Sequence, residues 1–260
     1  MARNILTTMT TCDARETDLA AIFERVHQCR LCPKVQASET KRASTVLSTA
    51  IDTVVVSQSP AENFVRRSGV QCFDKSAKLG TTGTNFEKFL NRFGRTLFPP
   101  RPVLLASGAT VPEAKPQWKS VYFTDLLKCF PGKRGKGQGD RTLLDREVTT
   151  CWDQRFLIAE LEIVRPRLVL LMGKESWTTF ARRLLGANPI PQTIESMLDL
   201  VSNTGALPRA SLGDHEFAYL PVHHSSGANM KRFAPLLKRE QVFDALSRAL
   251  SERSPGFSGG

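Results

Sequence analysis

Four of the chain's cysteines have a spacing that could hold a metal centre. Cys29 and Cys32 form a C-x-x-C pair, and two intervening residues let both sulfurs face one ion or cluster from a single turn. Cys129 and Cys151 flank a loop rich in glycine and positive charge, so thiolates from distant segments could close one site. Tetrahedral zinc and a 4Fe-4S cluster both take four thiolates, and cysteine spacing alone does not separate them.

Polar side chains follow four short apolar runs, which we expect to be parallel strands. Each run is largely apolar on both faces and is bounded by turn or polar residues; the runs are 53–57, 121–125, 167–172 and 217–222. In sheets of this kind, ligands bind at the carboxyl ends of the strands. The residues at those ends are Ser57 to Pro60, Asp125, Gly173 and His223 to Gly227. The sequence therefore predicts a pocket at this edge, with Asp125 on its floor.

Segments with helical periodicity alternate with these strands, at 19–27, 85–92, 144–163, 175–185 and 235–250. This alternation predicts an α/β, three-layer fold: a central parallel sheet of about four strands with helices on both faces. The stretches 98–116 and 131–140 are expected to be surface loops. We expect a single domain over residues 17–252, between a flexible leader, 1–16, and a flexible tail, 253–260.

Positive charge dominates the composition, with a net charge of +11 and a pI near 9.7. A protein this basic usually binds a polyanion, most often nucleic acid, although a uniformly solvated basic surface is the alternative. The clustering of the cations favours DNA as the partner, and six are candidate phosphate contacts: Lys133, Arg134, Lys136, Arg141, Lys231 and Arg232. No apolar run approaches the roughly 18–20 residues of a membrane span. We expect a cytoplasmic monomer without membrane contact or an obligate protein partner.

The order of these motifs resembles that of the uracil-DNA glycosylase superfamily, and most of all its iron–sulfur-containing family-four branch. The resemblance covers roughly residues 29–232. The stretch KCFPG around Cys129 is similar to the family's KCRPP, SQSPA at 57–61 is similar to GEAPG, and HSSG at 224–227 is similar to HPSG. The segment 165–174, which begins RPRL and ends MGK, resembles the family's third strand.

The resemblance implies a DNA glycosylase, an enzyme that takes one base out of the DNA stack and hydrolyses its bond to the sugar. It also implies that a 4Fe-4S cluster, with zinc as the alternative, is held by Cys29, Cys32, Cys129 and Cys151. The implied catalytic residues are Gln58, Asp125 and His224. The implied substrate contacts are Ser57, Ser59, Pro60, Phe73, His223 and Ser226.

Within this set, His224 is expected to donate to O2 of the base, Gln58 to hold a water, and Phe73 to stack on the flipped base. Three residues depart from the family pattern. Gln58 replaces an acidic residue, so it can orient a water but cannot act as a base, and Ser225 replaces a proline. Asp125 replaces the asparagine that reads the base.

The change at Asp125 bears on the substrate, because an ionised aspartate offers only hydrogen-bond acceptors. Acceptors suit the N4 amino group of cytosine and oppose O4 of uracil, unless burial returns a proton to the carboxylate. The resulting hypothesis is a glycosylase for a cytosine-type base, such as a modified cytosine in phage DNA. The alternatives are a uracil-DNA glycosylase of base excision repair, a catalytically silent DNA-binding relative, and a zinc-stabilised basic binding module.

Overall fold

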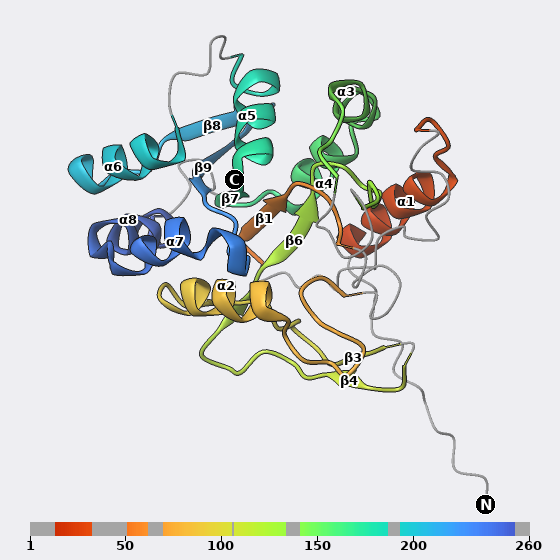
Figure 1. The fold of residues 1–260 in the computed structure, drawn as a ribbon, viewed down its shortest axis with the longest axis horizontal. Helices are drawn as coiled ribbons and strands as arrows, with labels where there is room; N and C mark the ends of the chain where they lie inside the picture. Colours follow the sequence, from red (N-terminus) through yellow and green to blue (C-terminus); the bar gives the residue numbers. More distant parts are fainter. Residues whose placement is uncertain are drawn as a thin grey trace, which may run out of the picture.

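A computed structural model describes residues 14–32, 51–61, 70–105, 107–133, 141–186 and 193–252. Its centre is a five-stranded sheet with the order β6-β1-β7-β9-β8 (Figure 1). The strands are β1 Thr53–Ser57, β6 Tyr122–Asp125, β7 Leu168–Met172, β8 Arg209–Leu212 and β9 His215–Val222. The first four in this order are parallel, which confirms the predicted sheet, and β8 adds an antiparallel edge that was not predicted.

The central strands are buried on both faces, as their continuous apolar sequences require. Every residue of β1 and of β7 is buried, and so is every residue of β6. The longer strand β9 is buried from Phe217 onward and is exposed only at its first residues. A sheet buried in this way needs helices on each side to cover it.

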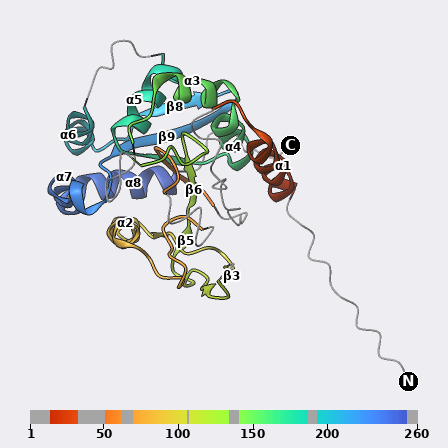
Figure 2. The same cartoon turned by 45° about the vertical axis from the view of Figure 1, so that its right-hand side comes forward.

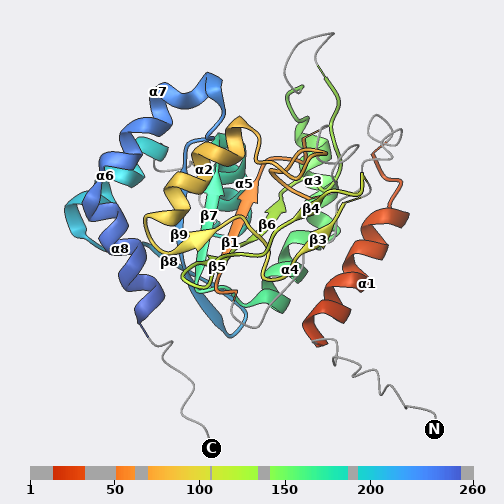
Figure 3. The same ribbon diagram turned by 90° about the horizontal axis from the view of Figure 1, so that it is seen from below.

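Helices cover both faces of the sheet (Figure 2). On one side lie α4, Phe156–Val164, and α5, Lys174–Arg183; on the other lie α2, Thr81–Asn91, and α8, Glu240–Ser251. Seen from below, α1 and α8 stand on opposite flanks of the sheet (Figure 3). The remaining helical elements are α1 Ala14–Gln28, α3 Asp145–Asp153, α6 Ile194–Thr204, α7 Met230–Phe233 and two 3-10 turns at Gly227–Asn229 and Ala234–Lys238. The predicted three-layer α/β fold is confirmed.

The helix predicted over 144–163 is two helices. Between α3 and α4, Arg155 has a φ of 57°, in the left-handed region that side chains with a Cβ rarely adopt. An α-helix cannot continue through such a residue, so the chain changes direction there. The helix predicted over 235–250 is similarly a 3-10 turn followed by α8, and α6 was not predicted.

The predicted surface loop 98–116 contains short strands. Within it, β3, Val103–Leu104, pairs with β4, Thr110–Val111, and just outside it β2, Arg95–Thr96, pairs with β5, Lys119–Ser120. These strands are only two residues long, which is too short to show an alternating pattern in the sequence.

The predicted domain start at residue 17 lies within the first turn of a helix. Helix α1 begins at Ala14, and within it Glu16 pairs with Arg101 at 2.9 Å. The rest of the predicted leader and the predicted tail 253–260 lie outside the described residues. No helix among those described is long and apolar enough to cross a bilayer.

Candidate active site and cysteine pocket

The carboxyl ends of the four parallel strands meet at one edge of the sheet. Ser57 and Asp125, the last residues of β1 and β6, are direct register partners. Next to them, the backbone N–H of Gly173, which follows β7, donates to the carbonyl of Val222, the last residue of β9, at 2.8 Å. The four segments expected to carry site residues are therefore neighbours.

Two cavities open at this edge, and they share Gln58, Glu175 and His224 as lining residues. The smaller cavity, of about 660 Å³, is also lined by Ser57, Ser59, Arg141 and Thr142. The larger, of about 1280 Å³, is also lined by residues that include Lys174, Trp177, Glu195, His223, Ser226 and Arg232. Two of the predicted catalytic residues, Gln58 and His224, thus face the same space from different strands.

Asp125 does not form an open pocket floor. Its side chain is fully buried and lines neither cavity. Its carboxylate accepts a hydrogen bond on each oxygen, from the Ser57 hydroxyl on Oδ1 and from the Gln71 amide on Oδ2. Because Ser57 lines the smaller cavity, Asp125 lies directly behind the cavity wall, covered by two donors.

The loop after β9 fixes the tautomer of His224. The backbone N–H of Ser226 donates to Nδ1 of His224 at 3.2 Å, so Nδ1 acts as an acceptor. In the neutral imidazole the ring proton then sits on Nε2, which becomes a donor. A donor is what the predicted contact to O2 of a base requires.

Ser225, which stands where the family has a proline, is a buried cross-link in this chain. Its hydroxyl donates to the carbonyl of Thr82 at 3.0 Å, and its own carbonyl accepts from the Asn85 amide at 3.1 Å. Both partners belong to α2. Two hydrogen bonds thus hold the loop that carries His224 against this helix.

His223 points to a different partner from His224. Its Nε2 lies 2.9 Å from a carboxylate oxygen of Glu195, in the first turn of α6, and both residues line the larger cavity. Burial lowers the pKa of His223, and the opposing pull of Glu195 is the smaller effect. His223 is therefore a wall residue held by α6.

Phe73 and Pro60 are not at the surface of either cavity. Phe73 is fully buried and packs edge-to-face on Phe98, with ring centroids 5.3 Å apart. As placed, Phe73 cannot stack on a flipped base, because its ring is already covered by the core. Ser59, by contrast, lines the smaller cavity, and Ser226 lines the larger one.

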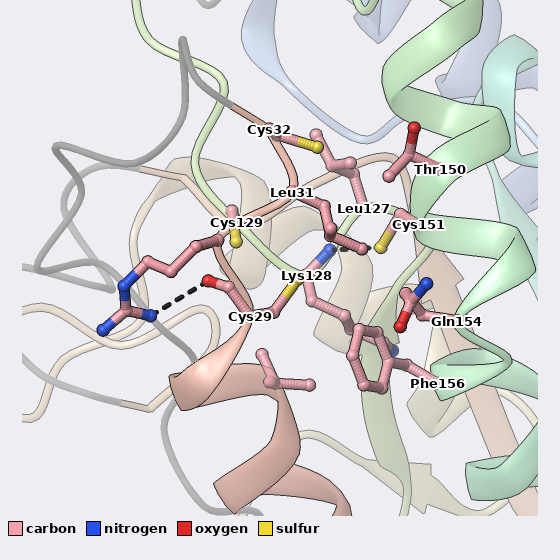
Figure 4. A pocket seen from close by; sticks show the side chains of 12 residues that line it. Cys29, Leu31, Cys32, Leu127, Lys128, Cys129, Thr150, Cys151, Gln154 and Phe156 are labelled. Atoms are coloured by element: carbon pink, nitrogen blue, oxygen red, sulfur yellow. Dashed lines mark hydrogen bonds between the residues drawn. The ribbon is translucent and has the colours of Figure 1, made fainter.

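The four predicted metal ligands line a single pocket on the other flank of β6. Figure 4 shows the sulfurs of Cys29, Cys32, Cys129 and Cys151 around a space that Leu31 and Leu127 also line. The C-x-x-C pair follows α1, Cys129 follows β6, and Cys151 lies on α3. Within the described ranges, no three His, Cys, Asp or Glu side chains are already arranged to hold one metal ion.

These thiols affect one another's ionisation. Burial raises the pKa of Cys151 to about 11, and the proximity of Cys32 and Cys29 adds to the rise. Burial also raises the pKa of Cys32, followed by the charge of Cys29 and of Glu147. Metal ligation requires thiolates, so a positive centre among these sulfurs would reverse the effect.

A buried ion pair lies next to the cysteine pocket. The Lys128 ammonium lies 2.7 Å from Glu160 and 2.6 Å from the Thr124 hydroxyl, and all three side chains are buried. The backbone N–H of Lys128 points to Cys151 Sγ at 3.5 Å. The segment between Asp125 and Cys129 is thus fixed on one side to α4 and on the other to the cysteines.

Arg141, predicted to bind phosphate, is engaged within the protein. Its guanidinium forms a two-pronged pair with Glu147 and donates to the Pro131 carbonyl, and its backbone N–H donates to the Gly132 carbonyl at 2.9 Å. It holds the pKa of Glu147 below the ordinary value. Arg141 therefore ties Pro131 and Gly132 to the first turn of α3.

The other predicted phosphate contacts divide between exposed and undescribed residues. Lys133 is exposed, with its ammonium 5.6 Å from the centre of the Phe130 ring. Lys231 and Arg232 are exposed on α7, just after the His224 loop. Arg134 and Lys136 lie outside the described residues.

Sequence reasoning missed two side chains at this edge. Gln71 is contributed by a segment without regular structure, so no periodicity or motif marked it. Glu175 lines both cavities. It comes two residues after Gly173, which follows the predicted strand 167–172, and this position close to a strand end was the signal that could have identified it.

A sequence model of the Uracil DNA glycosylase superfamily matches residues 46–251. No curated protein matches the chain. The matched region includes every strand of the central sheet and both cavities, and begins after the C-x-x-C pair. The order of strands and the site at their carboxyl ends agree with this match, and the chain belongs to the uracil-DNA glycosylase superfamily.

Proposed function

We propose that this protein is a DNA glycosylase that hydrolyses the N-glycosidic bond of a flipped cytosine-type base. The observation that carries the proposal is the environment of Asp125. Ser57 and Gln71 each direct a donor at one of its oxygens, and two donors stabilise a carboxylate rather than a carboxylic acid. An ionised Asp125 is the acceptor that the N4 amino group of cytosine needs.

The cover over Asp125 strengthens this preference. A base that reaches the carboxylate must displace the Ser57 or Gln71 donor, because Asp125 is otherwise buried. An amino group can replace the lost donor, whereas O4 of uracil is a second acceptor and cannot. The difference is worth about 1–3 kcal/mol, the usual discrimination of a good base contact.

Cleavage of the N-glycosidic bond needs groups that stabilise the departing base and groups that help water attack the sugar. As the bond breaks, the base acquires negative charge, which the Nε2–H of His224 would stabilise at O2. The sugar acquires positive charge and must be attacked by a water, which Gln58 would orient on the cavity wall. Exposed cations such as Lys231 and Arg232 would hold the DNA backbone without reading its sequence.

Selectivity for a modified cytosine is the finer part of the proposal. Ordinary cytosine is abundant in every genome, so a cell must be protected from an enzyme that removes it. The larger cavity adjoins the smaller one through three shared residues and offers polar side chains to a substituent on the base. A 5-substituted cytosine, as some phage DNA carries, would fit this arrangement.

We propose a 4Fe-4S cluster as the cofactor, with Cys29, Cys32, Cys129 and Cys151 as its ligands. The support is that all four line one pocket, together with the family resemblance of their spacing. When bound, the cluster would tie α1, the segment after β6 and α3 together. Visible absorption and an iron-to-protein ratio near four test it, whereas a colourless protein with zinc would support the alternative.

The test of the function is a base-release assay on duplexes that carry one uracil, one cytosine or one 5-substituted cytosine. We expect release of a cytosine-type base, and a shift toward uracil in Asp125→Asn, because an amide can both donate and accept. Release of uracil alone by the wild type would make the protein a repair enzyme. DNA binding without any base release would make it a catalytically silent relative.

A further inference from the structure

We infer that Glu175 is a catalytic residue, the carboxylate that accepts the proton of the attacking water. The inference rests on the proposed function and adds a residue to it. Hydrolysis breaks the bond between C1′ and the base nitrogen, whose electron pair leaves with the base. The water oxygen then forms a bond to C1′, and the proton it releases must be accepted. Gln58 cannot accept it, since an amide is not a base at neutral pH.

The start of α5 places Glu175 close to His224. Gly173, the residue before α5, has a φ of 92° and bonds through its N–H to the carbonyl of Val222. A Cβ on Gly173 would lie only 3.8 Å from Cβ of His224. Glu175 follows two residues later, in the first turn of the helix. Because the helix rises only about 1.5 Å per residue, Glu175 stays close to the His224 loop.

Glu175 lines both cavities together with Gln58 and His224. It is the only carboxylate among the described residues that line the smaller cavity. In the larger cavity a second acid, Glu195, is held by His223 at 2.9 Å. Among the described residues, no hydrogen bond or ion pair engages the Glu175 carboxylate, so it is available to a water or a substrate.

Two effects make a carboxylate at this junction useful to the reaction. It can accept the proton from a water that Gln58 orients. General-base catalysis of this kind typically raises the rate about 10²–10⁴-fold. Its negative charge also stabilises the cation-like sugar as the bond breaks. An acid in the first turn also stabilises a helix, and that role alone would affect folding but not the chemical step.

The test uses the full-length protein and single-turnover cleavage of a duplex carrying uracil or 5-hydroxymethylcytosine, whichever the wild type cuts faster. We expect Glu175→Gln to lower the rate at least about 100-fold, with DNA affinity and melting temperature close to wild type. Glu240→Gln, which removes an acid from the first turn of α8 that pairs with Arg92 and lines neither cavity, is the control for loss of a first-turn acid.

A second variant tests whether the carboxylate is the required group. Adding Gln58→Glu to Glu175→Gln returns an acid to the same cavity at another lining position, and we expect it to recover at least about tenfold of the lost rate. A wild type that cleaves while Glu175→Gln cleaves within threefold of it would overturn the inference and leave the proposed function standing. A wild type that releases no base would overturn both.

Discussion

Asp125 accepts hydrogen bonds from two side chains that differ in what they can do. The Ser57 hydroxyl can rotate and either donate or accept, whereas the Gln71 nitrogen only donates. Gln71 is therefore the partner that disfavours a proton on Oδ2 and keeps the carboxylate an acceptor. Under the proposed function, the choice between cytosine and uracil would then depend on Gln71 as well as on Asp125.

Gln71→Leu tests this role. Leucine removes the Gln71 donor, and a buried carboxylate that has lost a hydrogen bond favours the protonated acid, which can donate to O4 of uracil. We expect the rate on uracil relative to a cytosine-type base to rise about tenfold, within the ~1–3 kcal/mol of one base contact. The free energy of unfolding should fall by about 1–3 kcal/mol. Single-turnover rates on both duplexes and urea unfolding measure these effects; an unchanged ratio would remove Gln71 from base choice.

Ser225 shows how a replaced residue can take a new role. A proline at this position would stiffen the loop by its ring, while the serine holds the loop through its hydroxyl bond to the Thr82 carbonyl. The departure from the family motif is thus compatible with an ordered His224.

Ser225→Ala should lower stability by about 1–3 kcal/mol, because the Thr82 carbonyl loses a buried donor. We also expect a slower rate of base release at saturating DNA, since the loop that carries His224 loosens. Ser202→Ala is the matched control: its hydroxyl bonds to the Leu198 carbonyl one turn back within α6, so its loss should cost less than about 0.5 kcal/mol. Equal effects of the two substitutions would contradict the cross-link.

The exposed cations of α7 and the Arg141 side chain differ in what they can contact, although the net charge alone made all of them candidate phosphate contacts. Cations of α7 are exposed beside the His224 loop, while Arg141 is committed to Glu147. The salt dependence of DNA binding separates the two, because each phosphate contact contributes a slope of about 0.9 in log K against log salt.

Lys231→Gln should therefore reduce the slope by about 0.9 and weaken binding similarly on all sequences. Arg141→Gln should leave the slope unchanged and lower the melting temperature, because it removes the guanidinium contacts to Glu147 and the Pro131 carbonyl. Fluorescence anisotropy of a labelled duplex over a range of salt concentrations measures both. A reduced slope in Arg141→Gln would restore Arg141 as a phosphate contact.

The elements that the sequence predicted are those whose signal is local. Strands β1 and β7 appear as continuous aliphatic runs, and their bounds agree with prediction to within one residue. The break at Arg155 was missed, since a left-handed residue with a long side chain leaves no glycine or proline in the sequence. Gln71 was missed for a related reason: its contact with Asp125 joins residues 54 apart, and only the folded sheet brings them together.

At the scale of the molecule, the cysteine pocket connects parts that the sheet does not. Helix α1 lies outside the region matched to the superfamily and packs against α4. Its C-terminal end supplies Cys29, whereas Cys129 follows the strand that ends at Asp125. A shared ligand among these cysteines would therefore stabilise the position of β6 relative to α1.

The stability of the whole molecule should depend on pH through two histidines. Burial lowers the pKa of His215 and of His223 below the ordinary value of 6.5. Near His215 the charged groups are Arg165 and Asp214, and near His223 they are Glu195, Arg232 and Arg239. A lowered pKa means that the unfolded chain binds protons more readily than the folded one, so stability is full above pH 6.5 and decreases as the pH falls through it.

We therefore expect the free energy of unfolding, measured in urea, to be lower at pH 5.5 than at pH 8. Glutamine cannot take up a proton in this range, so the double variant His215→Gln and His223→Gln should lose less stability than the wild type over the same interval. His27→Gln, at an exposed position on α1, is the control and should follow the wild type. If the double variant and the wild type lost equal stability between the two pH values, other groups would be responsible, because these two histidines would then bind protons equally in both states.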